Sequence, residues 1–358
     1  MYQYKKFLIR MSFAIFILLS LIALFNYTVD SAGLFHRSNV MHKAAQELLK
    51  GNIVAGLGDE AFDDRQFQIS LIQLLQKRVK TIALGSSRTK ELRSQYLDNN
   101  NSFFNHAVNG ATLQDYIAIL GAYKKFQGYL PKRVILGVDP WILNKNNGRI
   151  RWKNIQNYAA FSRLMMHQHS KKHNESRFHF KKYQELLNYA YTIANIRFFI
   201  ETLKRNKDYY IVPTTMTDDF LRAPDGSIYY PFSTRQANVE QVALSAKKYT
   251  QGYVYGLENF KYDDTKKSFS LLIHNLQAAG VKVILFLAPY NPITYDILAK
   301  KEKYKLKEVQ GYFQTFAKKE NLQIVGSYNP HDFNLTTKDF FDGMHCHDYV
   351  IQKIFTAL

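Results

Sequence analysis

The alternation of hydrophobic and polar positions divides this chain into stretches of different character. Residues 11–27 read MSFAIFILLSLIALFNY, an apolar run without a charge. The next stretch, to residue 78, carries apolar residues at three- and four-residue spacing, which predicts helices. From residue 79 onward, short strand-like apolar runs alternate with amphipathic, helix-like stretches. This alternation predicts a mostly parallel sheet with helices on both faces.

The predicted strands are short apolar runs bounded by turn residues. They cover residues 81–85, 102–108, 133–138, 281–289 and 322–326. The predicted helices have one apolar face each. They cover residues 113–126, 265–280, 293–320 (as one helix or two) and 347–358. The predicted fold class is therefore α/β, a three-layer sandwich with a mostly parallel sheet.

The rhythm of strand and helix breaks between residues 141 and 264. Residues 141–210 contain 14 Lys and Arg against 4 Asp and Glu, in a mostly helical pattern. Asp225 and Gly226, between two apolar segments, predict a hairpin turn. We interpret 141–264 as a helical cap or insertion over one end of the sheet, within an α/β domain of residues 79–358. A basic run is usually a solvated face, but this position would also suit contact with an anionic glycan or lipid.

The N-terminal apolar run has the length and the flanks of a membrane anchor. With the apolar residues just before it, the run reaches the roughly 20 residues that span a bilayer. Basic residues precede the run and Asp30 is the first charge after it, so residues 1–6 are predicted to be a cytoplasmic tail. Residues 7–27 would form a single transmembrane anchor and 28–78 a juxtamembrane helical segment, with the remainder exported. A cleaved signal peptide is the alternative, but no convincing small-x-small cleavage site follows the run.

Charge and cysteine content narrow the compartment and the partners. The formal net charge is +19, which attracts anionic polymers and the membrane surface. Cys346 is the only cysteine, so no intramolecular disulfide can form. An exported protein without disulfides fits a bacterial envelope, in the periplasm or on the outer face of the cytoplasmic membrane. Export, without any zinc-finger, basic-zipper or RNA-binding motif, argues against nucleic acid as a partner.

The candidate chemistry lies where the predicted strands end, because ligands of open parallel sheets bind at the carboxyl ends of the strands. Polar residues follow four of the strands. They are Gly85-Ser86-Ser87-Arg88, Asn109-Gly110-Ala111-Thr112, Asp139-Pro140-Trp141 and Pro289-Tyr290-Asn291. A further loop, FFDGMHCHD, precedes the last helix and supplies an acid and a base.

Serine, aspartate and histidine thus occur in an order that would allow a catalytic triad. Ser86 or Ser87 could be a helix cap or a nucleophile. Asp342 and His345, three residues apart, could serve as orienting acid and general base. The backbone N–H groups of Ser87 and Gly110 could face a developing oxyanion.

These motifs resemble those of the SGNH/GDSL hydrolase-like superfamily. Gly85-Ser86-Ser87 matches its first block with Ser87 in the nucleophile position, Gly110 matches the oxyanion glycine, and Asp342-Gly343-Met344-His345 matches its Asp-x-x-His block. With the anchor, the resemblance is closest to membrane-bound branches that modify envelope polymers, the DltD-like D-alanyl transfer proteins and the AlgX/AlgJ-like alginate O-acetylation proteins. It implies an SGNH-type fold and a triad of Ser87, His345 and Asp342.

The third block departs from the superfamily pattern Gly-x-Asn, because the chain reads Gly137-Val138-Asp139. An ionised aspartate accepts hydrogen bonds and cannot donate to an oxyanion. Either Asn109 or Arg88 supplies the missing donor, or Asp139 has a binding or structural role. Substrate contacts are predicted for five residues at the strand ends: Arg88, Asp139, Trp141, Tyr290 and Asn291.

Other chemistries lack their motifs in this sequence. There is no GxSxG elbow, no GxxxxGK[ST] phosphate loop and no GxGxxG fingerprint, and no cofactor is predicted. Four histidines stand among lysines at irregular spacing, which favours a surface over a metal site. They are His167, His169, His173 and His179.

The leading interpretation is a membrane-anchored, extracytoplasmic acyltransferase, with O-acetyl transfer to a cell-envelope polysaccharide as the foremost case. The resemblance also implies a membrane-bound O-acyltransferase partner that delivers the acyl group. An SGNH esterase or deacetylase of envelope glycans or lipids is an alternative, because water could accept the same acyl group. A non-catalytic scaffold that binds anionic polymer in an envelope assembly complex is a third, which the Asp139 departure keeps open.

Overall fold

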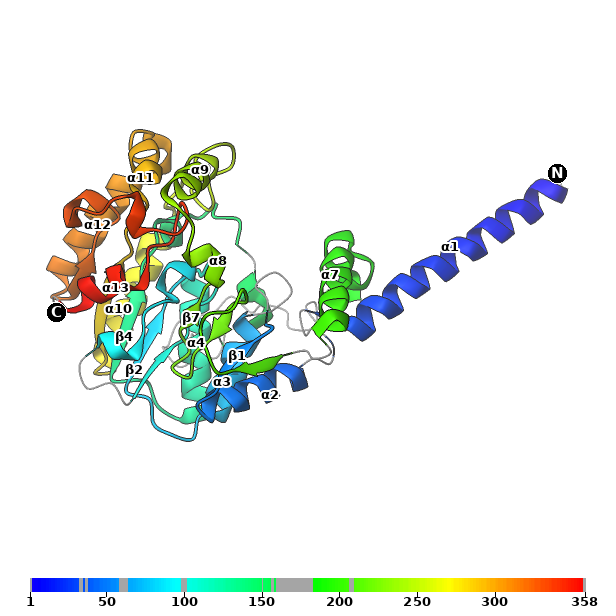
Figure 1. Ribbon diagram of the computed structural model, residues 1–358, viewed down its shortest axis with the longest axis horizontal. Helices are drawn as coiled ribbons and strands as arrows, with labels where there is room; N and C mark the ends of the chain where they lie inside the picture. Colours follow the sequence, from blue (N-terminus) through cyan, green and yellow to red (C-terminus); the bar gives the residue numbers. More distant parts are fainter. Residues whose placement is uncertain are drawn as a thin grey trace.

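A five-stranded parallel sheet forms the centre of the molecule, which is described here from a computed structural model (Figure 1). The description covers residues 2–31, 35, 38–57, 64–97, 102–149, 151–155, 158, 183–205 and 209–356. The strand order is β3-β2-β4-β8-β9. The strands are β2 (Thr81–Leu84), β3 (Phe103–Asn105), β4 (Arg133–Gly137), β8 (Lys282–Leu287) and β9 (Gln323–Gly326). Each lies inside a run predicted to be a strand, so the predicted mixed α/β class with a parallel sheet is confirmed.

Both faces of this sheet are buried. Along β4, Val134 and Leu136 join the larger hydrophobic core, whereas Ile135 points into a smaller core on the other side. The larger core includes residues of α3, α4, α10 and α12, and the smaller core includes residues of α13. Their bounds are α3 (Asp64–Leu74), α4 (Leu113–Ala122), α10 (Thr265–Ala278), α12 (Leu306–Lys319) and α13 (Asp348–Thr356). Burial on both faces explains why the strands are continuous apolar runs.

The stretch 293–320 forms two helices rather than one. Helix α11 (Pro292–Ala299) ends before α12, and Lys305 between them has a φ of 56°. A residue in the left-handed region cannot continue an α-helix, so the chain turns at this point.

A second, antiparallel sheet joins the predicted juxtamembrane segment to the predicted insertion, with the order β5-β1-β6-β7. Its strands are β1 (Ile53–Ala55), β5 (Tyr210–Val212), β6 (Leu221–Arg222) and β7 (Ile228–Tyr229). Strand β1 is a correction to the sequence analysis, which described 28–78 as a helical segment and predicted no strand in it. The flanking segments are helical as predicted, in α2 (Ser38–Leu49) and α3. The hairpin between β6 and β7 turns at Asp225 and Gly226, as predicted.

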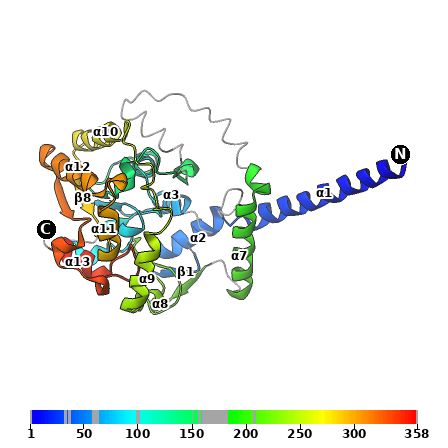
Figure 2. The ribbon, with the colours of Figure 1, turned by 90° about the horizontal axis from the view of Figure 1, so that it is seen from above.

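Helix α1 (Tyr2–Val29) projects from the rest of the molecule (Figure 1). It is long and apolar enough to cross a membrane, and none of its most apolar window is buried. This is what a single-pass anchor requires. Helix α7 (Tyr189–Arg205) lies across the end of α1 from which the chain enters the folded body (Figure 2). The insertion also supplies α8 (Phe232–Arg235) and α9 (Val239–Tyr249).

Candidate active site

The two serines after β2 have different environments. Ser86 is buried and its Oγ accepts a hydrogen bond from the Arg88 backbone N–H at 3.2 Å. It thereby caps the short 3₁₀ turn Ser87–Thr89, which is the capping role that the sequence allowed. Ser87 is partly exposed. The turn therefore buries one hydroxyl and presents the other.

Ser87 lies next to the loop that carries Asp342 and His345, at the carboxyl end of the sheet. The Nε2 atom of His345 lies 2.9 Å from Ser87 Oγ, and its Nδ1 atom lies 2.7 Å from Asp342 Oδ2. An Nδ1–H that donates to Asp342 leaves Nε2 free to accept the serine proton. The structure thus brings together the three residues predicted to be catalytic, although 258 positions separate the serine from the histidine.

Asp342 is held as a hydrogen-bond acceptor. Its Oδ1 atom accepts the backbone N–H groups of Met344 at 2.6 Å and His345 at 2.7 Å. Burial alone would raise the pKa of Asp342, but the charge and hydrogen bonds of His345 and the Met344 N–H lower it below its usual value. The carboxylate therefore stays ionised and can fix the imidazole tautomer. We call the hydrogen-bonded series of Ser87, His345 and Asp342 the relay. The His345 and Asp342 side chains are 17% and 28% exposed, so the relay is open to a ligand.

Neighbouring elements fix the loop that carries Asp342 and His345. Thr294 Oγ1 donates to the Gly343 carbonyl at 2.7 Å, and Asn291 Nδ2 donates to the Asp342 carbonyl at 3.4 Å. The Gly343 N–H donates to Ser245 Oγ at 3.3 Å. Because Ser245 belongs to α9, the predicted insertion takes part in positioning the site.

Two aromatic rings enclose His345. The Tyr230 ring centroid lies 5.1 Å from that of His345. Phe341 stacks on the imidazole, with ring centroids 5.8 Å apart and an interplanar angle of 8°. The Tyr230 hydroxyl also contacts the Ser87 carbonyl at 3.4 Å. Sequence reasoning did not assign either residue to the site. The only signal for Tyr230 was a tyrosine-rich segment, SIYYPF, which is equally typical of a packed core.

The predicted oxyanion turn lies beside the nucleophile turn, because the Val108 N–H donates to the Gly85 carbonyl at 2.9 Å. Gly110 has a φ of 55°, and a Cβ atom there would collide with the Tyr255 hydroxyl, so this position requires glycine. Within the described residues, the N–H groups of Ser87 and Gly110 donate no hydrogen bond to the protein. Both therefore remain available to an oxyanion.

Both backbone polar groups of Asn109 are engaged in hydrogen bonds within the protein. Its backbone N–H donates to Asp64 Oδ2 at 3.0 Å, and its carbonyl accepts from Arg65 at 3.2 Å. The partly exposed side-chain amide is the one group of Asn109 that could reach an oxyanion, as the sequence analysis considered.

Asp139, where the sequence departs from the superfamily pattern, has a buried partner. Asp139 Oδ1 lies 2.8 Å from Arg88 Nη1, with both side chains at most 3% exposed. The Arg88 guanidinium also donates to the Ala288 carbonyl and lies 3.8 Å over the Tyr290 ring. Burial raises the pKa of Asp139, and the Arg88 charge acts against that rise. Asp139 thus belongs to an internal ion pair.

The five residues predicted to contact substrate lie inside the protein. Each is at most 3% exposed. Trp141, for example, donates from Nε1 to the Ala111 carbonyl at 3.0 Å and packs edge-on against Tyr255, so it supports the Gly110 turn. This burial argues against direct substrate contact and favours a supporting role. The five are Arg88, Asp139, Trp141, Tyr290 and Asn291.

A buried acid that the sequence analysis missed ties the site to the second sheet. Asp64 accepts from Lys90 Nζ at 2.7 Å, from Arg222 of β6 and from the Asn109 N–H. Burial opposes ionisation of Asp64, but the two cations hold its pKa well below the usual value. The cluster connects α3, the segment after the nucleophile and the oxyanion turn.

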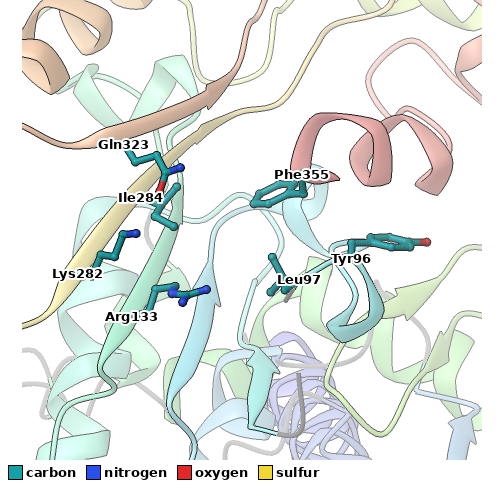
Figure 3. Close-up of a pocket in the computed structure, with 7 residues that line it drawn as sticks. All are labelled: Tyr96, Leu97, Arg133, Lys282, Ile284, Gln323 and Phe355. Carbon is teal, nitrogen blue, oxygen red and sulfur yellow. The ribbon is translucent and has the colours of Figure 1, made fainter. Parts of the chain in front are cut away.

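A pocket of about 130 Å³ lies at the opposite, amino end of the sheet (Figure 3). Arg133 and Lys282, which are register partners at the starts of β4 and β8, give it a basic wall. It contains none of the candidate catalytic residues. It is lined by Tyr96, Leu97, Arg133, Lys282, Ile284, Gln323 and Phe355. The usual place for a ligand in a parallel sheet is the other end, where Ser87 lies.

The histidines that the sequence analysis assigned to a surface, His167, His169, His173 and His179, lie outside the described residues. Within the described part of the chain, no group of three His, Cys, Asp or Glu is arranged to hold a metal ion.

Comparison of the chain with protein-family models and with curated protein sequences found no match in either. A function for this chain therefore has to be inferred from the geometry of the site and from the resemblance of its motifs.

Proposed function

We propose that this protein is a membrane-anchored, extracytoplasmic acyltransferase with Ser87 as its nucleophile. The observation that carries the proposal is the hydrogen-bonded series from Ser87 through His345 to Asp342. A parallel sheet buried on both faces supports the three-layer, SGNH-like arrangement that the motifs imply. The acceptor would be a hydroxyl group of a cell-envelope polysaccharide, and acetyl is the foremost candidate for the acyl group.

The geometry supports a two-step transfer. Ser87 Oγ attacks the acyl carbonyl carbon while its proton moves to His345 Nε2, and the leaving group departs with that proton. An acceptor hydroxyl then gives its proton to Nε2 and attacks the acyl-serine ester, which releases Ser87 and returns the proton to it. Asp342 keeps the imidazole oriented throughout. The N–H groups of Ser87 and Gly110 would stabilise the oxyanion, each by about 3 to 4 kcal/mol of barrier.

The anchor and the charge fit an envelope location. Basic residues in the first turns of α1, before its apolar run, favour a cytoplasmic N-terminus, which would put the α/β domain on the other side of the membrane. A net charge of +19 favours anionic polymers there. A membrane-bound O-acyltransferase partner, implied by the resemblance alone, would supply acyl groups across the membrane.

Hydrolysis is the alternative outcome of the same chemistry, because water can replace the hydroxyl acceptor. The non-catalytic scaffold rested on Asp139 standing in the place of an oxyanion donor. The buried pair with Arg88 gives Asp139 a structural role at this position. The presence of an acid there therefore no longer favours a scaffold over an enzyme.

The test uses the full-length chain in lipid vesicles with p-nitrophenyl acetate as donor and envelope polysaccharides as acceptors. We expect added acceptor to divert acetyl from free acetate to polymer ester, and Ser87→Ala to lose both products. Acetate release that no polymer can reduce would identify an esterase. Polymer acylation that a Ser87→Ala strain keeps in full would end the catalytic proposal.

A further inference from the structure

Helix α7 exposes an apolar stripe. Its five members are between 39% and 82% exposed and recur at intervals that put them on one side of a helix. They are Tyr189, Ile196, Phe199, Ile200 and Leu203. Contiguous apolar surface of this kind is rare on a protein that meets only water, and it marks an interaction site.

Buried hydrogen bonds fasten α7 to the end of α1. Asn26, near the end of α1, is fully buried and donates to the Leu186 carbonyl and to Thr192 Oγ1, both at 2.8 Å. Its Oδ1 atom accepts from Asn195 Nδ2 at 2.9 Å. Because a buried amide is costly without partners, this contact fixes where α7 crosses α1.

A second pair of contacts continues this attachment beyond α1. Tyr191 donates to Asp30 Oδ1 at 2.9 Å, and the Ser31 N–H donates to Asn195 Oδ1 at 2.8 Å. The crossing therefore coincides with Asp30, the first charge after the apolar run. This is the level at which a spanning helix leaves the hydrocarbon.

The apolar surface of α7 is continuous with that of α1. Phe199 packs edge-on against Phe25 with ring centroids 5.9 Å apart. Leu21 and Leu24, within the turn of α1 that precedes Phe25, are exposed. Figure 2 shows α7 lying across α1 rather than along it. A bilayer that surrounds α1 would therefore meet the stripe side-on at its surface.

We propose that α7 is an in-plane membrane helix, whose apolar stripe inserts at the boundary between headgroups and acyl chains of an anionic bilayer. Tyrosine and basic residues suit this depth, and α7 carries Tyr189 and the exposed Arg197 in a chain of net charge +19. Together, α1 and α7 attach the α/β domain to the membrane at two points. The attachment sets the orientation of the domain relative to the bilayer, a role independent of the chemistry at Ser87.

The test measures the depth of α7 in the full-length chain. A fluorophore sensitive to nitroxide is attached to Ile200→Cys or Leu203→Cys, and the protein is reconstituted into vesicles of phosphatidylcholine and phosphatidylglycerol. Leu244→Cys on α9, a residue 54% exposed and likewise apolar, is the matched control. Cys346 is buried, so the unsubstituted chain reports any background labelling. The three substituted positions are exposed, so the substitutions should leave the fold intact. The unfolding temperature of each labelled chain verifies this.

We expect lipid with a nitroxide near the headgroup to quench labels at 200 and 203 several-fold more than the label at 244. Equal quenching at all three positions would overturn the proposal. So would labels at 200 and 203 that stay accessible to aqueous iodide in pure lipid and become protected only when other membrane proteins are present. That result would assign the stripe to a protein partner instead.

Discussion

Ser87 and Arg88 are neighbours in the sequence, yet they belong to polar clusters of opposite kinds. Ser87 joins the partly exposed relay with His345 and Asp342. Arg88 turns inward, where it pairs with the buried Asp139 and lies over the Tyr290 ring. The relay has groups that can exchange protons with a ligand, whereas the internal pair can only hold the strand ends together.

The comparison assigns different consequences to substitutions one residue apart. Changes in the relay should alter the rate and leave folding nearly intact. Changes in the internal pair should alter folding stability first, because a buried charge without its partner is strongly destabilising. Measurements of activity and stability on the same variants can therefore separate the two clusters.

The largest expected effect is on activity, in Ser87→Ala. We expect acyl release from an activated ester to fall by about 10⁴-fold or more, because no other group replaces the nucleophile. The unfolding temperature should hardly change, since the Ser87 side chain is partly exposed.

Ser86→Ala is the matched control for that variant. It should keep most of the activity and lose about 1 kcal/mol of stability, because Ser86 caps the turn and takes no part in the contact with His345. The reverse pattern, in which Ser86→Ala is inactive and Ser87→Ala is active, would exchange the roles assigned to the two serines.

Arg88→Met tests the internal cluster. It should cost about 3 to 5 kcal/mol of unfolding free energy, because it leaves Asp139 buried without a cation. Denaturant unfolding of the chain in detergent, followed by circular dichroism, would measure this. The double variant Arg88→Met/Asp139→Leu should recover much of the loss. An Arg88→Met protein as stable as the original would show that the pair is not structural and would reopen a substrate-binding role.

A smaller effect is expected at Glu91, a buried residue 3.6 Å from Arg93. Burial, aided by the charges of Asp348 and Asp342, raises the pKa of Glu91 from 4.5 to about 8. Between these two pKa values, Glu91 is protonated in the folded state and ionised in the unfolded state. Its contribution to the free energy of unfolding is therefore full below pH 4.5 and declines up to about pH 8.

Glu91→Gln removes that dependence. Relative to the original chain, the variant should gain about 3 kcal/mol of stability between pH 5 and pH 8. Thermal unfolding at the two pH values measures the difference. A stability difference that stays constant over this range would mean that Glu91 ionises normally in the folded protein.

The fold was largely predictable where short-range pattern decides structure. The five strands of the parallel sheet are apolar on both faces, and that composition is visible in the sequence without knowledge of their partners. Strand β1 was missed because it has three residues and lies between two helices. It is a strand because it pairs with β5 and β6, which come from the distant insertion.

For the site, the sequence indicated the edge of the sheet but not the direction of each side chain. Ser87 and Arg88 both follow β2, and only the folded turn exposes one and buries the other. Tyr230 and Asp64 escaped prediction because a single tyrosine or aspartate has no local pattern. Their contacts to Ser87 and Asn109 depend on how the second sheet packs beside the first.

The central claim, that His345 activates Ser87 as a nucleophile, is tested most directly by covalent labelling. The full-length chain is treated with a fluorophosphonate probe, and the modified residue is identified by peptide mass spectrometry. We predict an adduct on Ser87 that forms much more slowly in His345→Gln and is absent in Ser87→Ala. An original chain that forms no adduct, or a Ser87→Ala chain labelled at the same rate elsewhere, would contradict the claim.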